Sequence, residues 1–225
     1  MEELSLLARL MRGLGSENID FRLRQRDFAL DAAPAGVPWL GMPVAQIDSL
    51  QSLLIVGSFL RKDHPLLAAR VRAAVKRGAR VSMIHAVRED LLMPLAATAI
   101  VPPSAWAQTL AGVLVAVLRG KNEAVPASLA GIEPDASAQA IATALAAGDT
   151  KAIWLGNAAV QCDRYAAIAR LAEAIGQAVG ARVGVLGEGP NSVGGYLAGA
   201  TPGTGGKNAR PMVQDMRVRR GGRVH

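Results

Sequence analysis

Two glycine-containing turns, each after an apolar run, carry the residues best suited to binding chemistry. The first turn holds Gly57 and Ser58, and the second holds Asn191. A turn that leads from a strand into a helix presents backbone N–H groups to an anion such as phosphate, because a helix N-terminus concentrates unpaired donors and partial positive charge. We therefore take Gly57, Ser58 and Asn191 as candidate cofactor-binding residues.

Each turn also has a purely structural interpretation. The complete dinucleotide fingerprint G-x-G-x-x-G is absent from both, so the glycines alone do not establish a nucleotide site. The first turn can simply close a strand-to-helix connection. The second can be a flexible loop that packs on a neighbouring domain.

The remaining reactive side chains do not form the pattern of a self-sufficient enzyme. His64, His85 and His225 lack the spacing of metal ligands, and the single cysteine, Cys162, cannot complete a metal site. Cys162 is interpreted as a small buried thiol rather than a nucleophile, because no histidine lies near it in sequence. No G-x-S-x-G turn, P-loop or recognisable carboxylate pair occurs. We predict no catalytic residue and no metal ligand in this chain.

Two strand–helix–strand units position the candidate turns. Apolar runs without polar alternation are typical of strands that are buried on both faces of a parallel sheet. Such runs cover residues 53–56, 81–85, 152–155 and 183–186. Between them, Pro65 suits the first turn of a helix that stops at Gly78, and Asp163 is expected to cap a helix that stops at Gly180. We predict a Rossmann-like α/β fold, an open and mainly parallel sheet with helices on both faces.

The chain divides into three predicted segments. Residues 1–48 form an N-terminal helix followed by an extended segment that contains Pro34. Residues 49–206 form the Rossmann-like domain, with a mostly helical insert at about 88–150. Residues 207–225 hold six cations and one acid, and they are predicted to be a basic disordered tail.

Composition narrows the class of protein. Apolar residues make up 51% of the chain, which is enough for a sizeable core. Most of the net charge of +7 lies in the tail, so we interpret it as a solvated segment rather than a nucleic-acid contact. No apolar run reaches the ~18–20 residues of a spanning helix, and Glu2 and Glu3 are unlike a signal peptide. We expect a cytoplasmic protein without direct membrane insertion.

Three segments together resemble the large iron–sulfur subunit of bacterial NADH:quinone oxidoreductase, the respiratory complex I. They are LMRGLGSENIDFRLRQRDF at 10–28, LLIVGSFLRKDHPLLAARVRAAVKRGARV at 53–81 and GEGPNSVGGYLAGATPG at 187–203. The resemblance runs from about residue 2 to about residue 210, in the family's order. That subunit is similar to molybdopterin oxidoreductases such as formate dehydrogenase, which implies their fold for this chain.

The resemblance also implies a role. The iron–sulfur clusters are expected in an N-terminal portion outside this chain, so Met1 would begin a piece of a longer protein. This piece would be a non-catalytic structural domain without a cofactor of its own. Its expected partners are the other complex I subunits and the missing cluster-bearing domains, at the inner membrane's periphery. Isolated from them, the chain is expected to self-associate.

One residue departs from the pattern of active molybdopterin enzymes. Those enzymes resemble this chain in the first turn but carry an asparagine where Phe59 stands here, and an apolar ring cannot replace amide hydrogen bonds. Molybdopterin is therefore not expected. Two alternatives stay open: the cofactor-binding domain of an active molybdopterin oxidoreductase, using Gly57, Ser58 and Asn191, and a free-standing nucleotide-binding module.

Overall fold

The computed structural model describes residues 1–31 and 36–221, with side chains described up to residue 216 except at 32–35. Pro34 of the predicted extended segment, and the tail residues 222–225 with His225, lie outside the described residues. The chain forms two compact units. We call Trp39–Glu188 the sheet unit, and Met1–Pro38 with Gly189–His225 the terminal unit.

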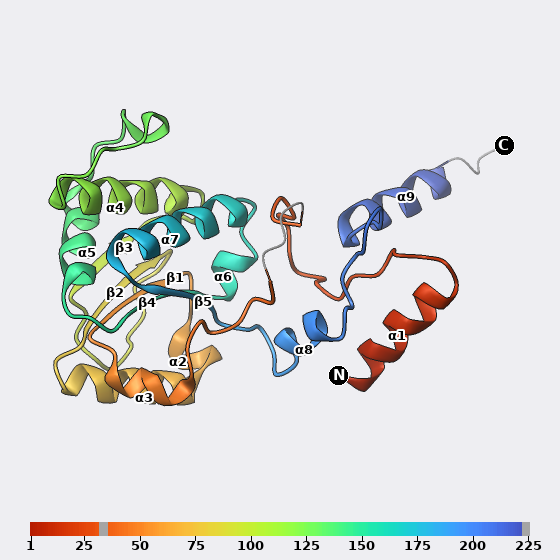
Figure 1. Cartoon of the computed structure of the whole chain (residues 1–225), viewed down its shortest axis with the longest axis horizontal. Coiled ribbons are helices and arrows are strands. Elements are labelled where there is room, and N and C mark those ends of the chain that lie inside the picture. The colour runs from red at the N-terminus through yellow and green to blue at the C-terminus, as the bar shows by residue number, and fades with distance from the viewer. Residues whose placement is uncertain (32–35, 222–225) are drawn as a thin grey trace. The chain divides into compact units, whose positions relative to one another are not determined.

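The sheet unit is built on five parallel strands in the order β3-β2-β1-β4-β5 (Figure 1). The central strand β1 pairs with β2 and β4, so that Ser52 lies opposite both Arg80 and Lys151. The prediction of an open, mainly parallel α/β sheet is confirmed. The strands are β1 Ser52–Val56, β2 Arg80–His85, β3 Ala97–Ile100, β4 Lys151–Leu155 and β5 Arg182–Val185.

Helices cover both faces of this sheet. Figure 1 shows α3 along one face and α4, α5 and α7 along the other. The helices of the sheet unit are α2 Leu60–Asp63, α3 Pro65–Lys76, α4 Trp106–Gly120, α5 Ala136–Ala146, α6 Asn157–Val160 and α7 Tyr165–Val179. Short 3-10 helices cover Val44–Ser49, Pro103–Ala105 and Ala127–Leu129. Pro65 lies in the first turn of α3, as predicted.

The core explains why the strands are apolar along their whole length. In β1, alternate residues Leu53 and Ile55 pack into the cluster that holds Val71 of α3, and strand geometry points Leu54 and Val56 to the opposite face. All five residues of β1 are buried. Burial on both faces of β1 favours apolar side chains, and a polar one is tolerated there when it is hydrogen-bonded internally. Ser52 meets this condition, because its hydroxyl donates to the carbonyl oxygen of Ala144 at 3.0 Å.

Two features of the sheet unit differ from the predictions. Strand β3 lies inside the segment predicted to be mostly helical, because a four-residue strand with two alanines has a weak strand signal. The N-cap of α7 is Arg164, without a side-chain cap, rather than Asp163. Gly180 ends α7 as predicted, in a left-handed conformation with φ of 73°.

The terminal unit joins the two ends of the described chain. Its helices are α1 Glu2–Gly13, α8 Ser192–Leu197 and α9 Ala209–Gly221. Ala8, Ile19 and Ala200 form its small core. The guanidinium of Arg22 bonds to the fully buried Asp20 carboxylate at 2.8 Å and to Asp31 at 2.6 Å. Because the pair is buried, it anchors the otherwise irregular segment after α1.

The compact units follow different borders from the predicted segments. Residues 39–48 belong to the sheet unit, since Met42 and Ile47 enter its core and the N–H of Val185 donates to the Trp39 carbonyl oxygen at 2.7 Å. Residues 189–206 belong to the terminal unit, where the N–H of Phe21 donates to the carbonyl oxygen of Ala200.

The predicted disordered tail is corrected for residues 209–221, which form α9. Pro211 falls in the first turn, where a missing N–H costs nothing, so no residue breaks the helix. The N–H of Ala209 donates to Asp20 Oδ2 at 3.1 Å, and Lys207 pairs with Asp215 at 2.5 Å. The high charge of this segment therefore did not prevent a helix, because local pairs offset part of the repulsion.

Candidate functional site

The strand order places a topological switch point between β1 and β4. Connections from these two neighbouring strands run to opposite sides of the sheet, and open α/β sheets have their crevice where this occurs, at the carboxyl ends of the strands. The turn after β1 begins with Gly57 and Ser58, and the turn after β4 begins with Gly156. The structure thus brings two of the three predicted site residues to this position.

Backbone hydrogen bonds close the turn at Gly57. The N–H of Gly57 donates to the carbonyl oxygen of Ile84 at 2.9 Å, and its own carbonyl oxygen accepts from Ala158 N at 3.0 Å. The N–H of Gly156 donates to the Val56 carbonyl oxygen at 2.8 Å. These bonds hold the turns after β1 and β4 against the neighbouring strand ends and against each other.

Close packing explains the glycine at position 57. Its φ is +60°, and a Cβ built there would lie 2.7 Å from both Ala159 N and the Trp106 ring. The neighbouring Ser58 is 1% exposed, and a Cβ added to Gly156 would collide with its side chain. Ser58 Oγ has no hydrogen-bond partner in the described chain. This part of the switch point is filled by protein atoms.

Phe59 fills the space beside these turns. Its ring meets the imidazole of His85 edge to face, with centroids 4.6 Å apart, and the ammonium of Lys62 lies 5.8 Å from the ring centroid. His85 is 1% exposed, stacks near Trp106 and has Nδ1 3.0 Å from the carbonyl oxygen of Val87. These contacts give His85 a structural role in the core of the sheet unit.

Sequence reasoning missed a group of polar residues at the same edge. His64 Nε2 lies 2.9 Å from the Gly187 carbonyl oxygen, and Asn157 Nδ2 donates to Asp63 at 3.3 Å. The remaining ring nitrogen of His64, the Asn157 carbonyl oxygen and both carboxylate oxygens of Glu89 are buried without a partner in the described chain. Their position within a few residues of strand ends was the available signal.

The carboxylate of Glu89 is the most perturbed acid of this group. Burial raises the pKa of Glu89, while the nearby charges of Lys62 and Arg61 act in the opposite direction. Its oxygens and the side-chain oxygen of Asn157 accept hydrogen bonds, whereas the unpartnered hydroxyl of Ser58 can also donate, so the spare groups at this edge are of both kinds. Each of these atoms has almost no solvent-exposed surface.

Asn191, the third predicted site residue, belongs to the terminal unit. It is the N-cap of α8 and makes no side-chain cap hydrogen bond, while its carbonyl oxygen accepts from Gly195 N at 2.8 Å. Gly57 and Ser58 belong to the sheet unit. Joint ligand binding by these three residues stays a prediction.

The sequence model of molybdopterin oxidoreductases matches residues 1–216. This chain belongs to the molybdopterin oxidoreductase family. A search of curated proteins found no match. The family implies a pterin cofactor, and the closed turn at Gly57 allows a test of fit. The residues at the switch point do not fit its phosphates, because Gly57 and Ser58 pack directly against Ala159 and Gly156, and the apolar ring of Phe59 packs on His85 beside them.

Other classes of site are not formed by the described residues. Among residues 1–31 and 36–221, no three His, Cys, Asp or Glu side chains gather as metal ligands. Cys162, predicted to be buried, is half-buried, with its sulfur 3.7 Å from the Pro103 carbonyl oxygen. In the same part of the chain, no helix is both long and apolar enough to cross a membrane.

Proposed function

We propose that this chain is a non-catalytic structural domain of the large iron–sulfur subunit of NADH–quinone oxidoreductase. In this role it supports electron transfer from NADH to quinone by the whole complex, without carrying electrons itself. Family membership alone is coarser than this, since it gives only the molybdopterin oxidoreductase domain. The finer assignment rests on the resemblance of residues 10–28, 53–81 and 187–203 and on the switch point.

The observation that carries the proposal is the closed turn after β1. The carbonyl oxygen of Gly57 accepts from Ala158 N at 3.0 Å, and a Cβ on Gly57 would lie 2.7 Å from Ala159 N, so the turn packs directly on α6. Phe59 packs against His85 in the same region. Protein atoms fill this part of the switch point, which is consistent with a domain that has a structural role and binds no ligand there.

The proposal includes partners and a location. The domain would contact the cluster-bearing N-terminal part of the parent subunit and other complex I subunits, in the peripheral arm at the cytoplasmic side of the inner membrane. Exposed leucines on α1 support a protein partner, because large apolar side chains that remain in water are often covered in an assembly.

Affinity purification from the source organism tests this assignment. A tag on the chromosomal gene is expected to bring down a complex that carries iron–sulfur clusters and oxidises NADH with a quinone acceptor. A control strain carries the same tag on an unrelated protein of the same compartment. Recovery of a molybdenum-containing enzyme without NADH–quinone activity would overturn the proposal.

The second candidate is the cofactor-binding domain of an active molybdopterin oxidoreductase. It is favoured by the family match and by the unpartnered polar atoms of Ser58, Asn157 and Glu89. Native mass spectrometry of the purified chain, with added molybdopterin extract and guanine nucleotides, separates the two candidates. Stoichiometric binding supports the cofactor domain, and a folded chain that binds neither supports the structural domain.

A further inference from the structure

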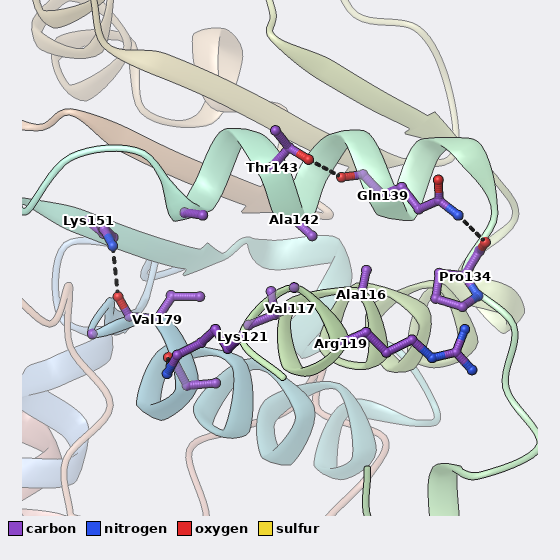
Figure 2. A pocket seen from close by; sticks show the side chains of 14 residues that line it. Ala116, Val117, Arg119, Lys121, Pro134, Gln139, Ala142, Thr143, Lys151 and Val179 are labelled. Carbon is purple, nitrogen blue, oxygen red and sulfur yellow. Dashed lines mark hydrogen bonds between the residues drawn. The ribbon is translucent and has the colours of Figure 1, made fainter. Parts of the chain in front are cut away.

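A cavity of about 850 Å³ lies at the amino edge of the sheet, the edge opposite to the turns after β1 and β4 (Figure 2). Its walls come from the C-terminal turns of α4 and α7, from α5 and from Lys151, the first residue of β4. This volume is in the range of small-molecule sites, ~300–1,000 Å³. No role discussed above uses it.

Most of the cavity wall is hydrocarbon. Small apolar residues of α4 and α5 face each other across it in Figure 2, and the wall includes Ala116, Val117, Ala142, Ala146 and Val179. The polar groups on the α5 side are engaged locally. Gln139 Nε2 donates to the Pro134 carbonyl oxygen at 3.1 Å, and Thr143 Oγ donates to the Gln139 carbonyl oxygen at 2.9 Å. This side therefore suits an apolar tail.

Two lysines stand together at the end of α7. Lys121 Nζ donates to the carbonyl oxygen of Ala178 at 2.8 Å, and Lys151 Nζ donates to that of Val179 at 2.9 Å. They satisfy the last carbonyl groups of the helix and neutralise its negative end. An ammonium group has three N–H donors, so each lysine keeps capacity for a further acceptor.

The charge balance at the cavity leaves one cation without an acid. Arg119 pairs with Glu133 at 2.8 Å, and Lys121 pairs with Glu123 at 2.6 Å. Within the described chain no carboxylate pairs with Lys151, and the lining residues include no Asp or Glu. The unmatched charge of Lys151 suits a ligand with a single negative charge.

We propose that this cavity binds an amphipathic monoanion, a carboxylate with an unbranched hydrocarbon tail. The carboxylate accepts hydrogen bonds from the ammonium groups of Lys151 and Lys121, and the tail lies on the small apolar residues between α4 and α5. A cation at one end of an apolar wall favours this class of ligand. A neutral ligand leaves the positive charge of Lys151 without a negative partner, and a cationic ligand is repelled by it. The inference goes beyond the proposed function and does not depend on it.

Isothermal titration calorimetry of the full chain tests the ligand class. Decanoate, below its micelle concentration, is expected to bind saturably with one site per chain. Decanol and decyltrimethylammonium have the same tail without the negative charge, and they are expected to bind at least about tenfold more weakly, the usual effect of one charge-assisted hydrogen bond. No saturable binding of decanoate, or equal binding of decanol, overturns the proposal.

Three variants test the place of binding. Lys151→Met is expected to weaken decanoate binding about tenfold or more, and Thr143→Phe is expected to block the tail, since this exposed position lines the cavity. Lys76→Met, at an exposed lysine on α3, is the control and leaves affinity unchanged. Should Lys151→Met fail to fold, Thr143→Phe decides alone. Affinity that is unchanged in Thr143→Phe overturns the proposal.

Discussion

At the residue scale, Gly57 joins two constraints in one position. Its left-handed backbone conformation is unfavourable for any residue with a Cβ, and its neighbours Ala159 and Trp106 leave no space for that atom. The same close approach lets its carbonyl oxygen reach Ala158 N. Gly57, which was predicted to bind a cofactor, therefore packs against the backbone of α6.

Substitution of Gly57 measures how much this packing contributes. We predict that Gly57→Ala lowers the free energy of unfolding of the sheet unit by about 2–5 kcal/mol, the sum of a left-handed alanine and a steric clash. Urea unfolding followed by tryptophan emission reports on this unit, since Trp39, Trp106 and Trp154 all belong to it. Gly180→Ala is the control. Its φ is +73° with no atom within 4 Å, so only about 1–2 kcal/mol is expected. Equal losses would contradict the packing argument.

The buried carboxylate of Glu89 makes stability depend on pH. Because burial raises its pKa, the folded chain binds its proton more tightly than the unfolded chain does. Its contribution to stability is full below the unfolded pKa, ~4.3, and is lost as the pH rises through the higher folded value.

Replacement of this acid by its neutral amide removes that loss. We predict that Glu89→Gln gains stability relative to the parent chain as the pH rises from about 4 to about 7, above the unfolded pKa. Urea unfolding at both pH values provides the comparison, and Glu173→Gln, at an exposed glutamate on α7, is the control. A difference that stays constant between the two pH values would show that burial does not perturb Glu89.

At the element scale, the helices differ in how they begin. Asp135 caps α5, with its Oδ1 accepting from Ala138 N at 2.7 Å, whereas α7 begins at Arg164 without a side-chain cap. Helix α5 contacts the strands β1, β2 and β3. Its start therefore fixes one wall of the sheet unit's core and of the amino-edge cavity.

Removal of the Asp135 cap is expected to destabilise α5 and no other helix. We predict that Asp135→Ala lowers the free energy of unfolding by about 1 kcal/mol, because the N–H of Ala138 loses its acceptor. Arg164→Ala, at the uncapped start of α7, is the matched control with no measurable change expected. Chemical denaturation of both variants gives the comparison. Identical effects would mean that the Asp135 bond contributes nothing.

At the scale of the whole molecule, the terminal unit exposes an apolar face of α1. Leu6 and Leu10 are 63% and 59% exposed, and their spacing of four residues places them on one side of the helix. Leu14, the C-cap residue that follows, is 73% exposed. The inner side of α1 packs Ala8 into the terminal unit's core. The exposed side has the character of a surface that a partner covers.

Association of the isolated chain follows from this face. We predict that the apparent molar mass rises with protein concentration in light scattering, and that the double change Leu6→Gln with Leu10→Gln suppresses the rise. Leu66→Gln is the control, because Leu66 on α3 is 81% exposed outside the terminal unit. A strict monomer at high concentration would contradict the prediction.

Local sequence determined the main elements of the sheet unit. The runs around Leu54 and Ile153 are apolar on every residue because both faces of their strands are covered. Such a run can be recognised from the sequence alone. Pro65 and Gly180 likewise mark a helix start and a helix end through their own backbone chemistry. Strand β3 left no such mark, since short alternating segments resemble helix and loop equally.

Only the tertiary structure decided what the switch point contains. The sequence offered Gly57 as a candidate cofactor-binding residue, and the fold places Ala158 N, about a hundred positions later, against its carbonyl oxygen. The buried Glu89 and Asn157, and the cavity beside Lys151, likewise depend on residues from separate strands and helices. Apolar periodicity fixes which segments are buried, but the partners of a polar group depend on contacts between distant positions, and one chain's local pattern does not contain them.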